Sequence, residues 1–200
     1  MKMKSTFLSL AALLAATTIY AAPQVGGKAP DFSVKDTNGK TESLSQYKGK
    51  YVVLEWTNPD CPFVHKHYDS GNMQKLQKEF TAKGVVWLSI NSSAEGKQGN
   101  YTPEKWNEIV KEKNASPTAV LLDNGGTVGK SYGAKTTPHM FIINPDGNLI
   151  YAGGIDSIES TNAADIPKAT NYVQAALDEA MAGKPVTTPT SHPYGCGVKY

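Results

Sequence analysis

A single cysteine, at the junction of an apolar run and a helical pattern, constrains this chain more than any other feature. The apolar run covers residues 51–56, the turn residues Asn-Pro-Asp fill 58–60, and Cys61 follows them. Pro62 and the pattern to about residue 83 predict a helix that begins beside the cysteine. Unpaired N–H groups and the dipole at a helix N-terminus favour the thiolate. Cys61 is therefore predicted to be a nucleophile, although a buried core position is the commoner fate of a lone cysteine.

Residues 1–22 are predicted to be a secretory signal peptide. Two lysines precede an apolar stretch over residues 7–19, and Ala21 and Ala22 end it with small side chains. The stretch is shorter than the roughly 20 residues of a membrane span, so we expect no stable membrane insertion after cleavage. An uncleaved N-terminal anchor is the alternative. The mature protein is expected to be periplasmic or secreted, in a compartment where disulfides persist.

The charge of the mature chain excludes one class of partner. The formal net charge is +2, and Lys2 and Lys4 of the leader account for that surplus. A nearly neutral mature chain lacks the basic excess that binds nucleic acid or anionic lipid, so no nucleic-acid partner is expected. Every basic residue apart from histidine is a lysine, and the chain contains no arginine.

The remaining patterns predict one α/β domain over residues 23–183. Strands that alternate with helices indicate parallel pairing, and turn signals of the Asn-Gly and Pro-Asp-Gly type predict two hairpins. We expect a central mixed β-sheet flanked by helices, with an N-terminal β-hairpin. The expected strands are 31–34, 41–44, 51–56, 85–90, 118–122, 138–143 and 148–151, and the expected helices are 62–83, one that starts near 102, and 166–182.

Residues 184–200 are predicted to be an extended tail with no core of its own, because Pro, Thr, Ser and Gly dominate them. The tail carries Cys196 between two glycines, which leaves the sulfur accessible. Residues 182–196 can extend about 45 Å, whereas a domain of this size has a radius of gyration of about 16 Å. Cys196 can therefore reach Cys61, and it is the candidate resolving thiol. Pairing of Cys196 with a cysteine of a second chain is the alternative.

Two further features accompany the nucleophile. Glu55 interrupts the apolar strand, where desolvation would raise its pKa and suit it to proton exchange near neutral pH. The alternative for Glu55 is a strand end that faces solvent. Thr137 and Pro138 directly precede a strand, which makes their peptide bond a candidate for the cis form, although most such bonds are trans.

This order of strand, cysteine at a helix start, Thr-Pro before a strand, hairpin and helix resembles the thioredoxin fold. The resemblance implies a cis Pro138 against Cys61, with Glu55 as the buried carboxylate six residues upstream. It also implies that backbone beside Pro138 pairs with substrate, with Thr137, Pro62 and His139 as substrate-binding residues. The segments 30–34, 56–68, 88–93, 135–140, 144–148 and 194–200 resemble exported proteins of the redoxin branch, which includes alkyl hydroperoxide reductases, thiol-specific antioxidants and peroxiredoxins.

The chain departs from that pattern in two ways. Val64 stands where thioredoxins have a second cysteine, so a dithiol cycle within the first helical turn is excluded. Asn58 stands where peroxiredoxins have a threonine, and their arginine is absent. Lys135 and His139 are the candidates for supplying a hydrogen-bond donor or positive charge in its place, without the planar fork of arginine.

The predicted function is that of a thiol–disulfide oxidoreductase or antioxidant redoxin without a cofactor. Cys61 attacks a disulfide or peroxide, Cys196 resolves the product, and an external dithiol reductant reduces the pair. One alternative is a copper carrier, in which Cys61, His65 and His139 bind the metal. For His65 and His67, solvated helix positions beside Lys66 are the competing interpretation. A second alternative is a structural module in which the disulfide only staples the tail.

Overall fold

The computed structural model describes residues 22–200, so the predicted leader, apart from Ala22, lies outside the described residues. A five-stranded sheet forms the centre of the molecule, in the order β5-β4-β3-β7-β8. Strands β3, β4 and β5 are parallel, and β7 runs antiparallel to both β3 and β8, so the expected mixed sheet is confirmed. The five strands are β3 (Val52–Trp56), β4 (Val86–Asn91), β5 (Ala119–Leu122), β7 (His139–Ile143) and β8 (Leu149–Gly153).

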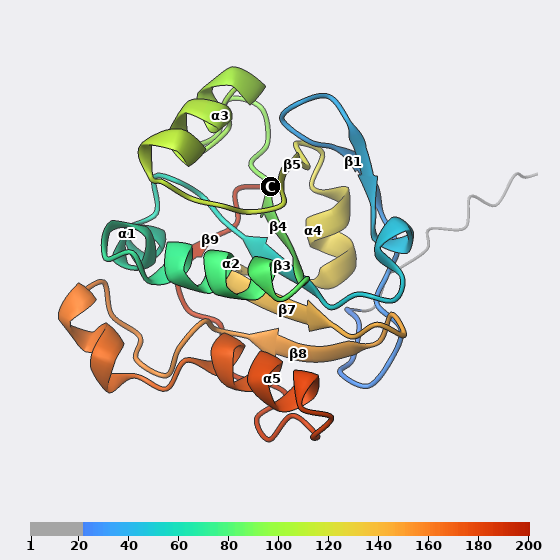
Figure 1. Cartoon of the computed structure of the whole chain (residues 1–200). Coiled ribbons are helices and arrows are strands. Elements are labelled where there is room, and N and C mark those ends of the chain that lie inside the picture. The colour runs from blue at the N-terminus through green and yellow to red at the C-terminus, as the bar shows by residue number, and fades with distance from the viewer. Residues whose placement is uncertain (1–21) are drawn as a thin grey trace, which may run out of the picture.

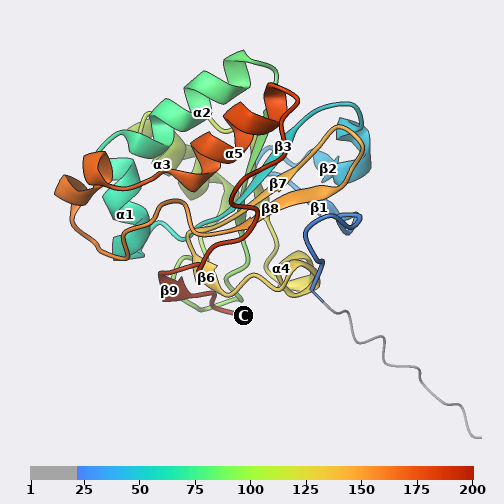
Figure 2. The same ribbon diagram turned by 90° about the horizontal axis from the view of Figure 1, so that it is seen from below.

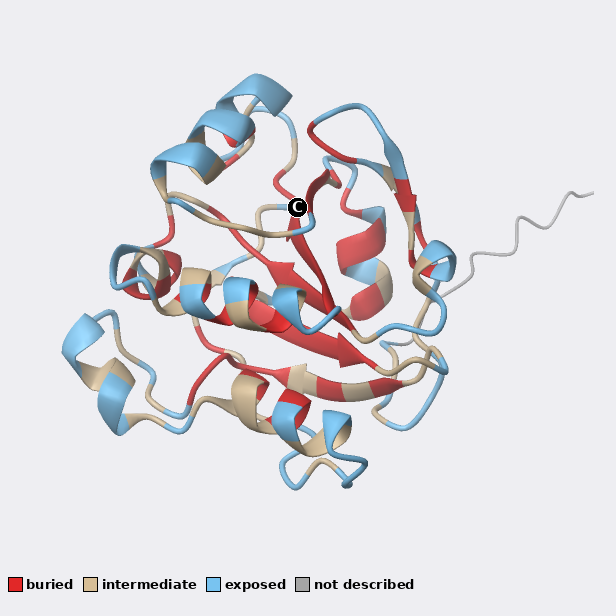
Figure 3. Ribbon diagram, in the orientation of Figure 1, coloured by how far each residue is buried: buried red, intermediate tan, exposed pale blue. Residues whose placement is uncertain are grey.

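Two layers cover the sheet. Helices α2 (Asn72–Ala82) and α5 (Tyr172–Met181) lie on one face, and helix α4 (Thr127–Tyr132) lies on the other (Figures 1 and 2). Side chains alternate along β3, so Val53 packs in the cluster with Phe80 of α2 while Leu54 and Trp56 pack in the cluster with Tyr132 of α4. All five residues of β3 are buried, as Figure 3 shows for the middle of the sheet. The apolar run of the sequence is therefore the core of the domain.

The N-terminal β-hairpin is confirmed, with strands β1 (Ser33–Lys35) and β2 (Thr41–Ser43), followed by the short helix η1 (Leu44–Tyr47). Helix α3 (Pro103–Glu112) also begins where expected, because the Thr102 hydroxyl accepts a hydrogen bond from the backbone N–H of Lys105 at 3.3 Å.

Two helix boundaries were predicted wrongly. The helix expected over 62–83 is broken into α1 (Pro62–Asp69) and α2, because Gly71 adopts a φ of 76° that a continuous helix does not allow. The last helix begins at Tyr172 rather than at 166, and the short helix η2 (Ala163–Lys168), with Pro167 inside it, precedes it. The Asn171 side chain caps α5.

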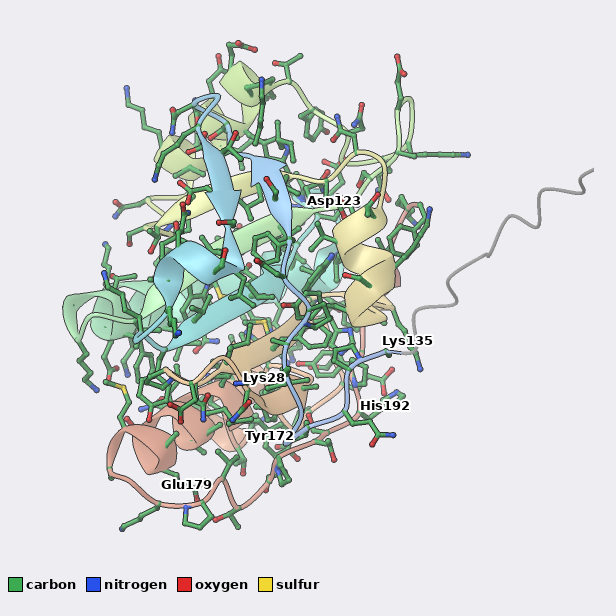
Figure 4. The ribbon with its side chains drawn as sticks, turned by 90° about the vertical axis from the view of Figure 1, so that its right-hand side faces the viewer. Lys28, Asp123, Lys135, Tyr172, Glu179 and His192 are labelled. Atoms are coloured by element: carbon green, nitrogen blue, oxygen red, sulfur yellow. The ribbon has the colours of Figure 1, made fainter. Side chains whose placement is uncertain are left out.

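Helix α4 was not predicted from the sequence, because residues 123–126 before it indicate a turn rather than the start of a helix. The buried carboxylate of Asp123 accepts hydrogen bonds from the N–H groups of Val128 and Gly129 at 3.2 and 2.9 Å, and so satisfies the N-terminus of the helix. In Figure 4 Asp123 lies beside α4 and Glu179 lies on α5, with the sheet between them.

The C-terminal tail runs beside β8 and then turns under the sheet (Figures 1 and 2). Ala152 of β8 exchanges backbone hydrogen bonds with Pro189 and Ser191 at 3.1 and 3.3 Å. The tail ends in β9 (Cys196–Gly197), which pairs with β6 (Thr136–Thr137). Tyr194 of the tail is buried in a core cluster of the domain. In the described part of the chain, no helix has the length and apolarity that a membrane span requires.

Candidate active site

Cys61 lies at the N-cap of helix α1, directly after the loop that follows β3. Its carbonyl oxygen accepts hydrogen bonds from the backbone N–H groups of Val64 and His65, both at 2.9 Å. The backbone N–H of Cys61 donates to the carbonyl of Asn58 at 3.1 Å, which closes the preceding turn. The predicted position at a helix start is confirmed. The cysteine is nevertheless fully buried in this structure.

The peptide bond between Thr137 and Pro138 is cis, as the resemblance implied. The carbonyl oxygen of Thr137 lies beside the sulfur of Cys61, and the Cys61 thiol donates a hydrogen bond to it at 3.1 Å. Thr137 and Pro138 therefore lie against Cys61. Pro62, the other expected contact residue, occupies the first position of α1 and is exposed.

Cys196, in the C-terminal tail, lies against Thr137 as well. It pairs with Thr137 across β6 and β9, and the Thr137 hydroxyl donates to its carbonyl oxygen at 3.4 Å. Cys61 and Cys196 therefore lie close together on either side of Thr137, and both thiols are free. The structure thus brings together the two residues that the sequence could only place within reach.

The two thiols differ in acidity. Burial raises the pKa of Cys61, but hydrogen bonds from Cys196, Thr137 and the backbone of Val64 more than offset this, and the pKa of Cys61 is lowered overall. For Cys196, burial and then the hydrogen bond and charge of Cys61 raise the pKa to about 11. Of the two thiols, Cys61 is therefore the one that loses its proton first as the pH rises. Once Cys61 is bonded to another sulfur, its charge is gone and Cys196 loses its proton more easily.

Glu55 is completely buried, so the alternative of a solvent-facing strand end is wrong. Burial raises the pKa of Glu55, and its hydrogen bonds to neighbouring side chains oppose the shift only in part. Within residues 22–200, its hydrogen-bond partners do not include either cysteine. They are Tyr68 at 2.7 Å, Trp87 at 2.8 Å, Ser89 at 3.0 Å and Gln77 at 3.3 Å.

His139 does not supply the positive charge considered for it. Burial and then the positive charge of Lys135 lower its pKa to about 3, so the ring is neutral at physiological pH. Its Nδ1 atom accepts a hydrogen bond from the backbone N–H of Lys135 at 3.2 Å. Lys135 itself is exposed, and Figure 4 shows it on the outside of the molecule.

The alternative metal site is not assembled. His65 pairs with Asp69 at 3.0 Å on the outer face of α1, and His139 is directed to the backbone of Lys135. Among residues 22–200, no group of three or more His, Cys, Asp or Glu side chains is arranged to hold a metal ion. Copper binding by Cys61, His65 and His139 therefore has no support in this structure.

The sequence interpretation missed a polar cluster formed by Lys66, His67, Asp156 and Tyr194. The competing interpretation of a solvated helix position is wrong for His67, which is 0% exposed, and Lys66 beside it is 3% exposed. The amphipathic pattern of α1 gave no signal for this, because η2 and the tail cover a face of the helix that the local sequence marks as polar. A tyrosine two residues before Cys196 was the only hint that the tail is anchored.

With this geometry established, comparison with known proteins identifies the relatives. A model of the AhpC/TSA family matches residues 25–152. The chain is 29% identical over 127 residues to the thiol-disulfide oxidoreductase ResA of Bacillus thuringiensis subsp. konkukian, which covers 64% of this chain and 68% of ResA. It is 33% identical over 135 residues to the selenocysteine-containing peroxiredoxin PrxU of Peptoclostridium acidaminophilum, which covers 62% of this chain and 64% of PrxU.

Solved structures agree with the fold. The crystal structure of a conserved protein from Geobacillus kaustophilus superposes with a TM-score of 0.77 at 26% sequence identity, and the match covers 92% of this chain and 94% of that one. Together with the sheet order and the cis-proline beside the cysteine, this confirms the expected thioredoxin-like fold.

Proposed function

Because the chain belongs to the AhpC/TSA family, we propose that it reduces disulfides or peroxides with Cys61 as the nucleophile and Cys196 as the resolving thiol. The predicted redoxin family is confirmed by the match over residues 25–152. The predicted class, a thiol-dependent oxidoreductase, is confirmed by relatives that are thiol–disulfide oxidoreductases and peroxiredoxins. The observation that carries the proposal is the position of the two free cysteines, both against Thr137 beside the cis-proline.

The proposed cycle has two oxidation steps, followed by reduction back to the starting thiols. The Cys61 thiolate attacks a disulfide and releases one thiolate, or attacks a peroxide and releases water or an alcohol while becoming a sulfenic acid. Cys196 gives up its proton and attacks the Cys61 sulfur, which releases the second thiolate or water and forms the Cys61–Cys196 disulfide. An external dithiol then reduces this disulfide and is itself oxidised.

Glu55 is the proposed group for proton exchange. Its raised pKa and complete burial support this role. Because its hydrogen bonds go to Tyr68, Gln77, Trp87 and Ser89, we propose that the proton travels between Glu55 and the thiols through an intervening water molecule.

Thr137 is the proposed contact for a peptide substrate, through its backbone edge. That edge is occupied by Cys196 of the same chain in the reduced protein. A peptide substrate therefore pairs with Thr137 only after the tail has left β6, whereas a small oxidant requires a smaller movement.

We also propose that the protein acts outside the cytoplasm. The N-terminal pattern of two lysines, an apolar stretch and small residues supports export. The proposed partners are a disulfide or peroxide substrate and an external dithiol reductant.

Intact-mass spectrometry after one equivalent of hydrogen peroxide tests the function. We expect the unaltered protein to lose two hydrogens, as one intramolecular disulfide forms, and to regain them with a dithiol. We expect the Cys196→Ser variant to gain oxygen on Cys61 instead. A dimer joined by Cys196, or an unaltered protein that gains oxygen and never closes a disulfide, would contradict the assigned role of Cys196.

A further inference from the structure

A buried ion pair lies beneath the tail, outside the contact between the two thiols. The Nζ atom of Lys66 is 3.0 Å from the Oδ2 atom of Asp156, and the two side chains are 0% and 3% exposed. Lys66 also donates to the carbonyl oxygen of Ile158 at 2.9 Å and to the hydroxyl of Tyr194 at 3.3 Å. All three donors of the ammonium group therefore have partners inside the protein.

Tyr194 connects this ion pair to the tail. Its hydroxyl donates to the Oδ1 atom of Asp156, so the carboxylate is shared by a residue of the tail and a residue of helix α1. The tyrosine ring packs edge-on against Phe63 of α1 with centroids 5.8 Å apart, and the Lys66 Nζ atom lies 5.4 Å from the ring centroid. Tyr194 is thus held in place by three contacts, which are to Asp156, Phe63 and Lys66.

His67 closes the cluster without adding charge. Burial lowers its pKa to about 4, although Asp156 opposes the shift, so the ring is neutral at physiological pH. Its Nδ1 atom is 2.9 Å from the amide nitrogen of Asn72, and its Nε2 atom is 3.5 Å from the Tyr194 hydroxyl. The cluster consists of one cation, one anion and neutral groups around them.

The cluster lies close in sequence to both cysteines. Lys66 is on the helix that Cys61 begins, and Tyr194 precedes Cys196 by two residues. Gly195 is the only spacer, so the Tyr194 and Cys196 Cα atoms are at most about 7 Å apart. Gly195 has a φ of 142° and packs where a Cβ would overlap the carbonyl oxygen of Thr137. A fixed Tyr194 therefore fixes the position of Cys196.

A buried ion pair contributes little net stability compared with apolar residues of similar size, because both charges are desolvated. Its hydrogen bonds do fix one geometry, and here that geometry joins helix α1 to the tail. We propose that Lys66, Asp156 and Tyr194 form a latch that positions Cys196 for attack on Cys61. All three are positioning residues that act through the tail, and the inference rests on the proposed role of Cys196 as the resolving thiol.

A reaction with two observable steps distinguishes the effect of the latch on Cys196 from the reactivity of Cys61. An aromatic disulfide reagent that releases a coloured thiolate reports first the attack by Cys61 and then, in a second release, the closure of the Cys61–Cys196 disulfide. Tyr194→Phe keeps the ring against Phe63 and removes only the hydroxyl. We expect it to slow the second release by about tenfold, the effect of one hydrogen bond to a charged group, and not to slow the first.

Tyr200→Phe is the matched control. Tyr200 is in the same tail, and its hydroxyl donates to the carbonyl oxygen of Ala134 at 2.8 Å, away from the cluster. We expect the rates of both thiolate releases in this variant to stay within about twofold of those of the unaltered protein. The same kind of hydroxyl group is removed, but at a position that does not contact the ion pair. Equal slowing in both tyrosine variants, or unchanged closure in Tyr194→Phe, would overturn the latch.

A second variant and an equilibrium measurement guard against a folding defect. Asp156→Asn keeps the shape of the acceptor and should slow closure in the same direction. Equilibration with glutathione should show a disulfide equilibrium constant about tenfold lower in Tyr194→Phe than in Tyr200→Phe, a change that lost stability alone does not produce. Equal constants would count against the latch. A second release that persists in Cys196→Ser would instead overturn the proposed function itself.

Discussion

The sulfur of Cys61 lies 3.1 Å from the carbonyl oxygen of Thr137, the residue that also pairs with the second cysteine of the chain. One residue beside a cis-proline therefore holds both sulfurs in place. In the thioredoxin pattern, the second thiol stands in the first turn of the helix, at the position of Val64. Here a tail more than a hundred residues later in the chain brings the second thiol to the same point.

The acidity of Cys61 should depend on the group that Cys196 presents to it. Because the neighbouring Cys196 favours the charged form of Cys61 and so lowers its pKa, Cys196→Ala should raise the pKa of Cys61 toward the ordinary value of about 8.5. Cys196→Ser retains a donor and should raise it less. The measurement is the pH dependence of the alkylation rate of Cys61 in the two variants. Identical midpoints would show that Cys196 does not stabilise the thiolate.

Gly195 should be intolerant of any side chain. A Cβ at this position would overlap the Thr137 carbonyl, and its φ of 142° is unfavourable for other residues, so Gly195→Ala should displace Cys196 from β6. We expect disulfide closure to slow by at least about tenfold, from roughly 1–3 kcal/mol of strain. Gly197→Ala is the control, because its nearest neighbour to a Cβ is 4.0 Å away. Rapid quenching with an alkylating agent followed by mass analysis measures closure, and equal rates in the two variants would refute the prediction.

The two cysteines should differ in their effect on turnover. Cys61→Ser should abolish reduction of disulfides or peroxides, because no other thiolate stands at the helix N-terminus. Cys196→Ser should leave the first attack intact but reduce turnover by about 100-fold at roughly 10 μM reductant, because an external thiol then replaces one held at roughly millimolar effective concentration. Steady-state assays with a dithiol reductant provide the measurement. Full turnover without Cys196 would mean that another thiol resolves Cys61.

Glu55 should make stability depend on pH. Since burial raises its pKa in the folded protein, the folded state holds this proton more tightly than the unfolded state. The stability from this group is complete below the unfolded pKa, about 4.3, and is lost as the pH rises through the folded pKa.

Glu55→Gln removes this dependence. Its carbonyl oxygen can still accept from Trp87 and Ser89, and its amide can donate to the Tyr68 hydroxyl. In the unaltered protein, the contribution of Glu55 makes the unfolding free energy fall with rising pH by at most about 1.4 kcal/mol per pH unit. This contribution should be missing in the variant. Denaturant titration of both proteins at several pH values measures the difference. Parallel profiles for the two proteins would show that Glu55 does not titrate differently on folding.

The local pattern of the sequence was enough for the sheet and for the start of α1. Residues 51–56, 85–90 and 118–122 are apolar runs that fit only buried strands, and the structure places β3, β4 and β5 there within one residue. Helix ends were less well predicted. The break at Gly71 depends on a single backbone conformation. The late start of α5 depends on the Asn171 side chain, which accepts a hydrogen bond from the backbone N–H of Gln174.

The sequence by itself determined three features, because each follows from local periodicity or chain length. They are Cys61 at the start of a helix, Glu55 inside a buried strand, and Cys196 on a tail long enough to reach the site. The tertiary structure decided which groups meet. It placed Cys196 on Thr137, neutralised His139 by burying it, and enclosed Lys66 with Asp156 and Tyr194. These outcomes depend on contacts between segments far apart in the chain, since burial, and with it charge and acidity, is a property of the packed molecule rather than of any local stretch.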